Sequence, residues 1–150
     1  MWILILIVVL IVCSISDIKY KTINVMVLFY GILISFITAP FYFKGEIGDI
    51  VNNIVIGTIP GILLLIVSKI GHHIGEGDGY VIITSGILAG LPITVSALII
   101  SLIISAIFGL IFIFVMKKSA SYSIPFIPFY TVGFLLCLTK QIITNVPVLR

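Results

Sequence analysis

Residues 75–116 have the sequence GEGDGYVIITSGILAGLPITVSALIISLIISAIFGLIFIFVM. As one helix, the apolar part from Tyr80 to Met116 would be roughly 55 Å long at ~1.5 Å per residue, which exceeds a ~30 Å hydrocarbon core. Gly90-Leu91-Pro92 is the place where such a helix breaks, because proline cannot continue the hydrogen-bond ladder. We therefore expect two helices here, over residues 79–91 and 93–116.

The composition defines the class of protein. Hydrophobic residues make up 61% of the 150-residue chain and charged residues 9%, and the mean hydropathy is +1.42, far from the balance of soluble domains. The first apolar run lacks a basic n-region and a small-residue cleavage site, so we expect it to be retained as a span. We predict a single all-α domain over residues 1–150, a polytopic membrane helix bundle of about six transmembrane helices, at 1–16, 23–43, 50–69, 79–91, 93–116 and 127–146.

The basic residues predict the orientation of these spans. At about 13 residues the fourth segment is short, which leaves a re-entrant helix as an alternative. Six full spans place five lysines on one side of the membrane and three basic residues on the other, whereas a re-entrant segment would divide the first group. The positive-inside rule favours six spans with both termini outside. The two groups are Lys19, Lys21, Lys69, Lys117 and Lys118 on the inside, and Lys44, Lys140 and Arg150 on the outside.

Two aspartates lie at the ends of apolar runs. Only five residues are acidic; Asp17 ends the first run and Asp78 opens the fourth, so both are expected at the cytoplasmic face. An ionisable side chain at membrane depth is a functional-site hypothesis by default. Two carboxyl groups held close together tend to share one proton. Such a pair hydrolyses peptides without a covalent intermediate, because one group takes a proton from water and the other donates one to the carbonyl oxygen.

Glycines flank the second aspartate. Gly75, Gly77 and Gly79 allow positive φ and a close approach to a neighbouring helix or an extended substrate. The alternative is a flexible loop in which Asp78 is merely the N-cap of the following helix. The local pattern leaves these two interpretations open.

Three motifs resemble the type IV prepilin peptidases and archaeal preflagellin peptidases. Gly75-Glu76-Gly77-Asp78 matches the Gly-x-Gly-Asp motif of that family at the start of the fourth of six spans. Asp17 is similar to the first catalytic aspartate and precedes a basic loop with Ile23 at the family's Ile position, although Asn24 replaces the usual proline. Residues 124–129, Ile-Pro-Phe-Ile-Pro-Phe, are similar to the Pro-Phe-x-Pro-Phe stretch that opens the last span.

The resemblance implies a membrane aspartyl endopeptidase with Asp17 and Asp78 as catalytic residues and Gly75, Gly77 and Gly79 as motif support. Its partners would be the lipid bilayer and a prepilin-like or preflagellin substrate, whose leader is cleaved at the cytoplasmic face of the inner (cytoplasmic) membrane; no cofactor and no nucleic acid are implied. Tyr80 stands where the family often has lysine. The Cys-x-x-Cys insertion of the larger bacterial members is missing, so we expect the short, peptidase-only form without methyltransferase activity.

Other conspicuous residues have less specific interpretations. Five residues are possible substrate contacts, although solvent exposure or packing is the simpler explanation for them: Glu76, Pro125, Phe126, Pro128 and Phe129. His72-His73 lacks a third ligand at useful spacing, so we expect no metal site. Cys13 and Cys137 lie inside apolar runs and are expected to be small core residues.

A competing hypothesis is a non-catalytic membrane transporter or pilus-assembly subunit that uses the paired carboxylates. A transport path needs ionisable groups through the bilayer, and the inner spans contain no acid at their middle. A protease of the presenilin or signal-peptide-peptidase type is disfavoured because no Pro-Ala-Leu motif is present.

Overall fold

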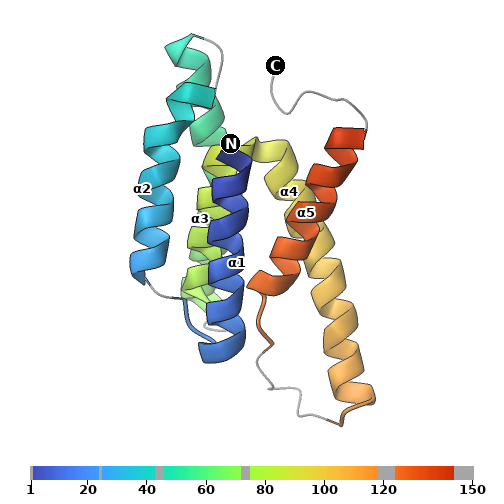
Figure 1. Cartoon of the computed structure of the whole chain (residues 1–150). Coiled ribbons are helices and arrows are strands. Elements are labelled where there is room, and N and C mark those ends of the chain that lie inside the picture. Colours follow the sequence, from blue (N-terminus) through green and yellow to red (C-terminus); the bar gives the residue numbers. More distant parts are fainter. Residues whose placement is uncertain (1, 24, 43–45, 72–74, 118–123, 144–150) are drawn as a thin grey trace.

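The computed structural model describes residues 2–23, 25–42, 46–71, 75–117 and 124–143. Within these ranges the chain is all-helical, as predicted (Figure 1). The helices are α1 (Trp2–Tyr20), α2 (Val25–Tyr42), α3 (Ile47–Gly71), α4 (Glu76–Phe114) and α5 (Ile127–Ile143).

Helix α4 is bent into two arms at the predicted place. Gly90 has φ 76° and ψ 169°, outside the helical region, and Pro92 follows inside the helix. Glycine adopts this positive φ without the steric penalty of a side chain. The chain reverses there, so the first arm (76–89) runs beside α3 and the second arm (91–114) runs back beside α5 (Figure 1).

Three helical segments in the described part of the chain are long and apolar enough to cross a membrane: Ile3–Tyr20, Ile47–Ile70 and Glu76–Phe114. Phe29–Thr38 and Ile127–Lys140 are shorter apolar helices. The count of about six spans therefore stays a prediction. Its closest structural support is the bend in α4, whose two arms correspond to the expected fourth and fifth helices.

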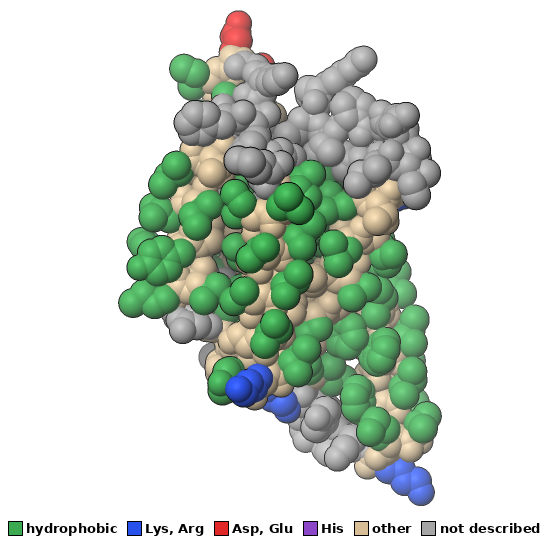
Figure 2. All heavy atoms as spheres, in the orientation of Figure 1, with side chains coloured by type: hydrophobic (Ala, Val, Ile, Leu, Met, Phe, Trp, Pro, Cys, Tyr) green, Lys and Arg blue, Asp and Glu red, His purple; other side chains and the backbone are tan. Residues whose placement is uncertain are grey.

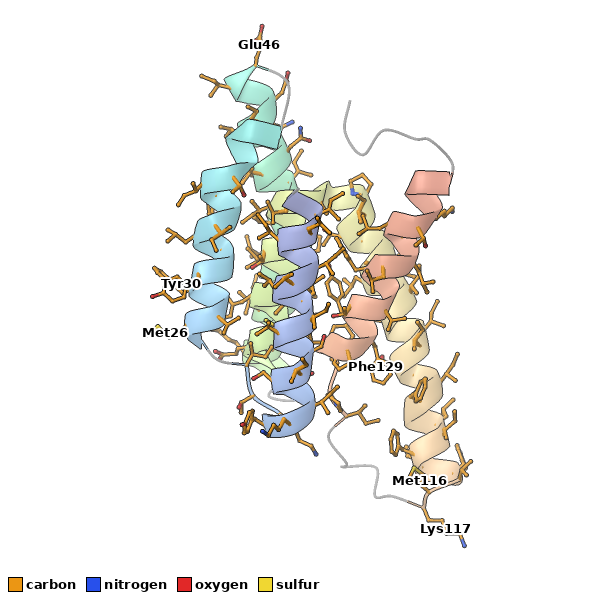
Figure 3. The ribbon with its side chains drawn as sticks, viewed as in Figure 1. Met26, Tyr30, Glu46, Met116, Lys117 and Phe129 are labelled. Atoms are coloured by element: carbon orange, nitrogen blue, oxygen red, sulfur yellow. The ribbon has the colours of Figure 1, made fainter. Side chains whose placement is uncertain are left out.

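Charged side chains gather at the two ends of the bundle and hydrophobic ones cover the face between them (Figure 2). Glu46 lies at one end and Lys117 at the other (Figure 3). Lys19 and Lys69 are in the last turns of α1 and α3, at the same end as Lys117. Lys19, Lys69 and Lys117 therefore share one end of the bundle, as their grouping predicts, and the side of the membrane that this end faces stays a prediction. Lys44, Lys118 and Arg150 lie outside the described residues.

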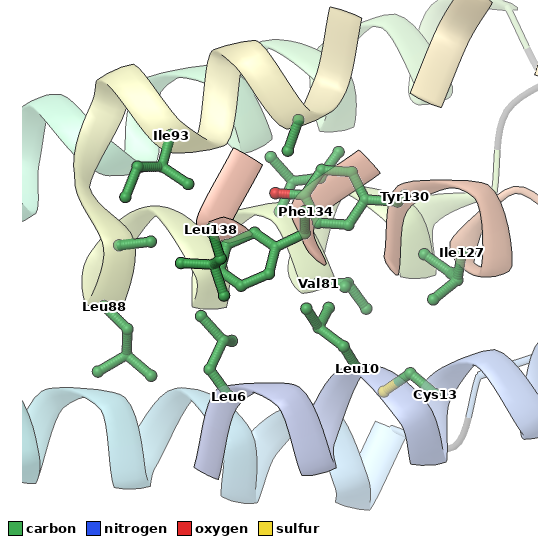
Figure 4. Close-up of a cluster of buried hydrophobic side chains, with 13 residues drawn as sticks. Leu6, Leu10, Cys13, Val81, Leu88, Ile93, Ile127, Tyr130, Phe134 and Leu138 are labelled. Atoms are coloured by element: carbon green, nitrogen blue, oxygen red, sulfur yellow. The ribbon is translucent and has the colours of Figure 1, made fainter. Parts of the chain in front are cut away.

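The main core joins α1, α4 and α5 (Figure 4). Tyr130 and Phe134 of α5 are fully buried between α1 and the two arms of α4, and the Tyr130 hydroxyl is hydrogen-bonded to Ser85 Oγ. Cys13 is buried in this core and Cys137 packs against it, which confirms their prediction as small core residues. The packing of α5 against α1 in this core places the start of α5 beside the end of α1.

Helix α3 packs on the first arm of α4 through glycines. A Cβ atom on Gly57 would overlap the backbone carbonyl of Gly86, and a Cβ on Gly86 would overlap that of Gly57. One turn further along α3, a Cβ on Gly61 would lie 2.7 Å from the carbonyl oxygen of Gly79. Small residues at such crossings let helix backbones approach closely in a membrane.

This crossing predicts a specific sensitivity. Gly86→Ala should lower the free energy of unfolding by about 3 kcal/mol or more, because two backbones must separate to admit one methyl group. Gly48→Ala is the matched control, since a Cβ on Gly48 meets nothing within 4 Å. Thermal unfolding in detergent measures both; equal stability of the two variants would contradict the described crossing.

Candidate active site

Asp17 lies in the last turns of α1 and is 8% exposed. Its Oδ2 atom accepts a hydrogen bond of 3.0 Å from the backbone N–H of Ile127, the first residue of α5. The first N–H groups of a helix have no partner within that helix, and negative charge is stabilised near a helix N-terminus. The Asp17 carboxyl therefore supplies an acceptor for an N–H group at the start of α5 that has no partner within the helix. In return, the N-terminus of α5 stabilises a negative charge on Asp17.

Helix α1 ends in a tight turn directly after Asp17. The Lys21 N–H donates to the Asp17 carbonyl oxygen at 2.9 Å, and Lys21 has φ 51°, in the left-handed region common at helix C-termini. The Ser16 hydroxyl donates to the Thr22 carbonyl oxygen at 3.0 Å. These contacts turn the chain so that Ile23 reaches the beginning of α4.

Asp78 is the third residue of α4 and is 9% exposed. The N-cap is Gly75, with φ −68° and ψ 131°, and no side chain caps this end. An Asp78 carboxyl oxygen lies 3.5 Å from the place where a Cβ on Gly75 would be, so the side chain folds back over that glycine. The alternative of a loop with Asp78 as N-cap is therefore wrong, because the helix starts two residues before it.

The two carboxyl groups come together at one end of the bundle. Asp17 and Asp78 are close enough to interact electrostatically. Between described residues, the backbone N–H groups of Ile127 and Phe126 both donate to the Asp17 carboxyl, and no hydrogen bond ends on that of Asp78. The pair is thus asymmetric in its hydrogen bonds: the Asp17 carboxyl accepts from the first residue of α5, whereas the Asp78 carboxyl, in the first turn of its own helix α4, accepts none among the described residues.

The motif glycines act through close packing. The expectation of positive φ is wrong for Gly75, Gly77 and Gly79, because among the described glycines Gly90 is the one with a positive φ. A Cβ on Gly77 would lie 2.8 Å from Ile23 Cδ1, and one on Gly79 would lie 2.6 Å from Leu65. The expected approach to neighbouring elements is correct, and it holds the beginning of α4 against α3 and the α1–α2 link.

The other predicted contact residues are divided between solvent and packing. Glu76 is exposed, and Tyr80 is 39% exposed. Pro125, Phe126, Pro128 and Phe129 are all partly buried. The Phe129 ring centroid is 5.2 Å from that of Phe108 on the second arm of α4 (Figure 3), and Phe126 is 6.3 Å from Tyr130. Substrate contact by any of the five stays a prediction.

His72 and His73 lie outside the described residues. Within the described ranges, no group of three or more His, Cys, Asp or Glu side chains could hold a metal ion.

Two hydroxyl residues beside Asp17 were missed by the sequence analysis. Ser14 Oγ is 2.7 Å from Thr131 Oγ1, and the Thr131 hydroxyl also donates to the Ile127 carbonyl oxygen at 3.0 Å. Ser14 precedes Asp17 by three residues and Thr131 follows Ile127 by four, so the pair lies one helical turn from the Asp17–Ile127 bond. Hydroxyl groups at helical spacing inside apolar runs were the available signal.

These features define a helical, membrane-type protein with two buried carboxyl groups at one end. Residues 4–114, which include both aspartates and both arms of α4, match the sequence model of the type IV leader peptidase family. The chain belongs to this family and is therefore a peptidase related to those that remove leaders. No curated protein and no solved structure matches the chain.

The Asp17–Ile127 bond predicts different effects of two substitutions. Asp17→Asn keeps an oxygen acceptor for the buried Ile127 N–H, whereas Asp17→Ala leaves that N–H unpaired at a cost of about 1–3 kcal/mol. Thermal unfolding should show Asp17→Ala clearly less stable than Asp17→Asn. The same pair of changes at Asp78 serves as the control and should show a smaller gap; an equal gap would contradict the capping role of Asp17.

Proposed function

We propose that the protein is an aspartyl endopeptidase of the cytoplasmic membrane that removes the N-terminal leader of a type IV prepilin-like or preflagellin substrate. The observation that carries the proposal is that Asp17 and Asp78 are both buried and close enough to interact electrostatically, in a member of a leader peptidase family. Asp17 comes from α1 and Asp78 from α4, so the site depends on the folded bundle.

The asymmetry of the pair supports different roles for its two members. The Ile127 N–H stabilises negative charge on Asp17, so Asp17 is the general base that takes a proton from the attacking water. Asp78, buried without a donor among the described residues, holds the shared proton and donates it to the oxygen of the scissile carbonyl group. Collapse of the tetrahedral intermediate returns that proton to Asp78, and the proton held by Asp17 passes to the leaving amine.

The surroundings of the pair support a basic leader as substrate. Glu76 is exposed two residues before Asp78, where its carboxylate can attract a cationic leader residue. Pro125, Phe126, Pro128 and Phe129 are partly buried and flank Ile127, whose N–H binds Asp17, so they provide apolar surface beside the site. We infer that the leader extends toward Glu76 while the substrate's apolar helix lies in the bilayer, and that no methyl transfer follows.

The transporter hypothesis finds no support in the bundle. It requires ionisable groups along a path between the two ends. The acidic residues other than Asp17 and Asp78 are Glu46, Asp49 and Glu76, and all three are exposed. A hydrolytic pair at one end fits this arrangement better than a conducting path.

The proposal predicts that Asp17→Asn and Asp78→Asn each reduce leader cleavage at least about 10³-fold, because asparagine keeps the shape of aspartate but cannot exchange a proton. Mass analysis of a prepilin-like peptide incubated with each purified variant measures the loss. Thermal unfolding is the control for retained structure. Cleavage near the wild-type rate by either folded variant would disprove the pairing.

The cytoplasmic location of the site gives a second prediction. In a background with Cys13 and Cys137 replaced by alanine, a cysteine at Glu46 should react with a membrane-impermeant thiol reagent in intact cells. A cysteine at Lys117, at the other end of the bundle (Figure 3), should react only after the cells are opened. The opposite labelling pattern would place the two aspartates outside the cell.

A further inference from the structure

The glycine before Asp78 is in direct contact with the link that follows α1. A Cβ on Gly77 would lie 2.8 Å from Ile23 Cδ1 and 3.1 Å from both Ile23 Cβ and Cγ1. Non-bonded carbon atoms of neighbouring side chains do not approach each other so closely without displacement. Ile23 can therefore occupy its position only because residue 77 has no side chain.

The three motif glycines have different neighbours. Gly75 faces the carboxyl group of Asp78, and Gly79 faces Leu65 and Gly61 of α3. The three atoms nearest to a Cβ on Gly77 all belong to Ile23, which lies outside α3 and α4. Each glycine thus accommodates a different part of the site, and Gly77 alone of the three connects it to the chain segment that carries Asp17.

Ile23 is itself held in place from both sides. It is partly buried and packs against the main hydrophobic core. On the other side, the left-handed Lys21 and the Ser16–Thr22 hydrogen bond fix the turn between Asp17 and Ile23. A displacement of Ile23 is therefore transmitted through a short, constrained turn to the end of α1.

We propose that Ile23 and Gly77 are positioning residues that set the separation of the two aspartates. The contact joins the turn after Asp17 to the residue before Asp78. The size of the side chains at positions 23 and 77 therefore determines how closely α1 and α4 approach each other at the site. This inference rests on the proposed peptidase function for its kinetic consequences, while the contact itself is independent of activity.

The test begins with Gly77→Ala, which adds one methyl group against Ile23. We expect kcat for leader cleavage to fall about 10- to 100-fold with KM within about twofold, because a small misplacement of catalytic groups affects the chemical step. The range of pH over which the enzyme is active should narrow as well, since two carboxyl groups that move apart titrate less as a coupled pair. A general loss of stability would not change the pH profile.

Rescue by the partner residue distinguishes the contact from other effects of the substitution. Ile23→Ala removes Cγ1 and Cδ1, so the double variant Gly77→Ala/Ile23→Ala should recover most of the lost kcat. Ile23→Val removes only Cδ1 and leaves the two 3.1 Å approaches, so it should restore an intermediate kcat. Gly48→Ala is the control for glycine replacement and should behave as wild type, because its Cβ meets nothing within 4 Å.

The outcomes separate this inference from the proposed function. Wild-type kcat in Gly77→Ala, or no recovery in the double variant, would overturn the inference while leaving the peptidase intact. If Gly77→Ala does not fold, Ile23→Ala alone decides, and an unchanged kcat and pH profile would overturn it. A wild-type protein that cleaves no leader peptide contradicts the proposed function; the contact is then tested by thermal unfolding, where additive effects of the two substitutions would refute it.

Discussion

The reversal of α4 at Gly90 determines which helices meet around the two aspartates. A straight α4 would carry its second half away from the bundle, and α5 would have no surface on which to return. Because the chain turns back, the second arm supports α5, and Gly133 of α5 packs closely on the backbone of Ala97 and Ser101. The first residue of α5 then reaches Asp17, so a single positive φ near one end of the bundle positions a hydrogen bond near the other.

The hydrogen bond between Ile127 and Asp17 connects the packing of α5 to the environment of the candidate active site. A carboxylate that caps a neighbouring helix is partly neutralised by that helix, which makes a negative charge tolerable in a poorly solvated place. The Asp78 carboxyl group lacks such a donor among the described residues, and glycine packing positions the start of α4, which carries it. Two identical side chains thereby acquire different environments, as the proposed roles of general base and general acid require.

The sequence could predict much of this arrangement. Helix length and the chemistry of proline predict the long apolar helices and the break at Gly90-Leu91-Pro92. They also predict that Asp17 and Asp78 lie at one end of the bundle. The end of α1 was less predictable: Ser16-Asp17-Ile18-Lys19-Tyr20 is polar enough to suggest a loop, yet it stays helical to Tyr20. The N-terminus of α5 satisfies the Asp17 carboxyl there, and that partner lies 110 residues away in sequence.

The tertiary contacts around the two aspartates could not be predicted from the sequence. Ile127 contributes a backbone N–H, which every residue except proline possesses. The close packing of Gly77 and Gly79 depends on Ile23 and Leu65, whose proximity only the folded chain reveals.

Chemical cross-linking of positions 17 and 78 can establish whether Asp17 and Asp78 face each other at one end of the bundle. In protein with Cys13 and Cys137 replaced by alanine, cysteines at positions 17 and 78 are treated with a short bifunctional thiol reagent. If the two side chains face each other, intact mass should show one bridging reagent per molecule. A control pair at positions 48 and 78, at opposite ends of the bundle, should carry two separate reagents. Two separate reagents on the 17/78 pair would contradict the account.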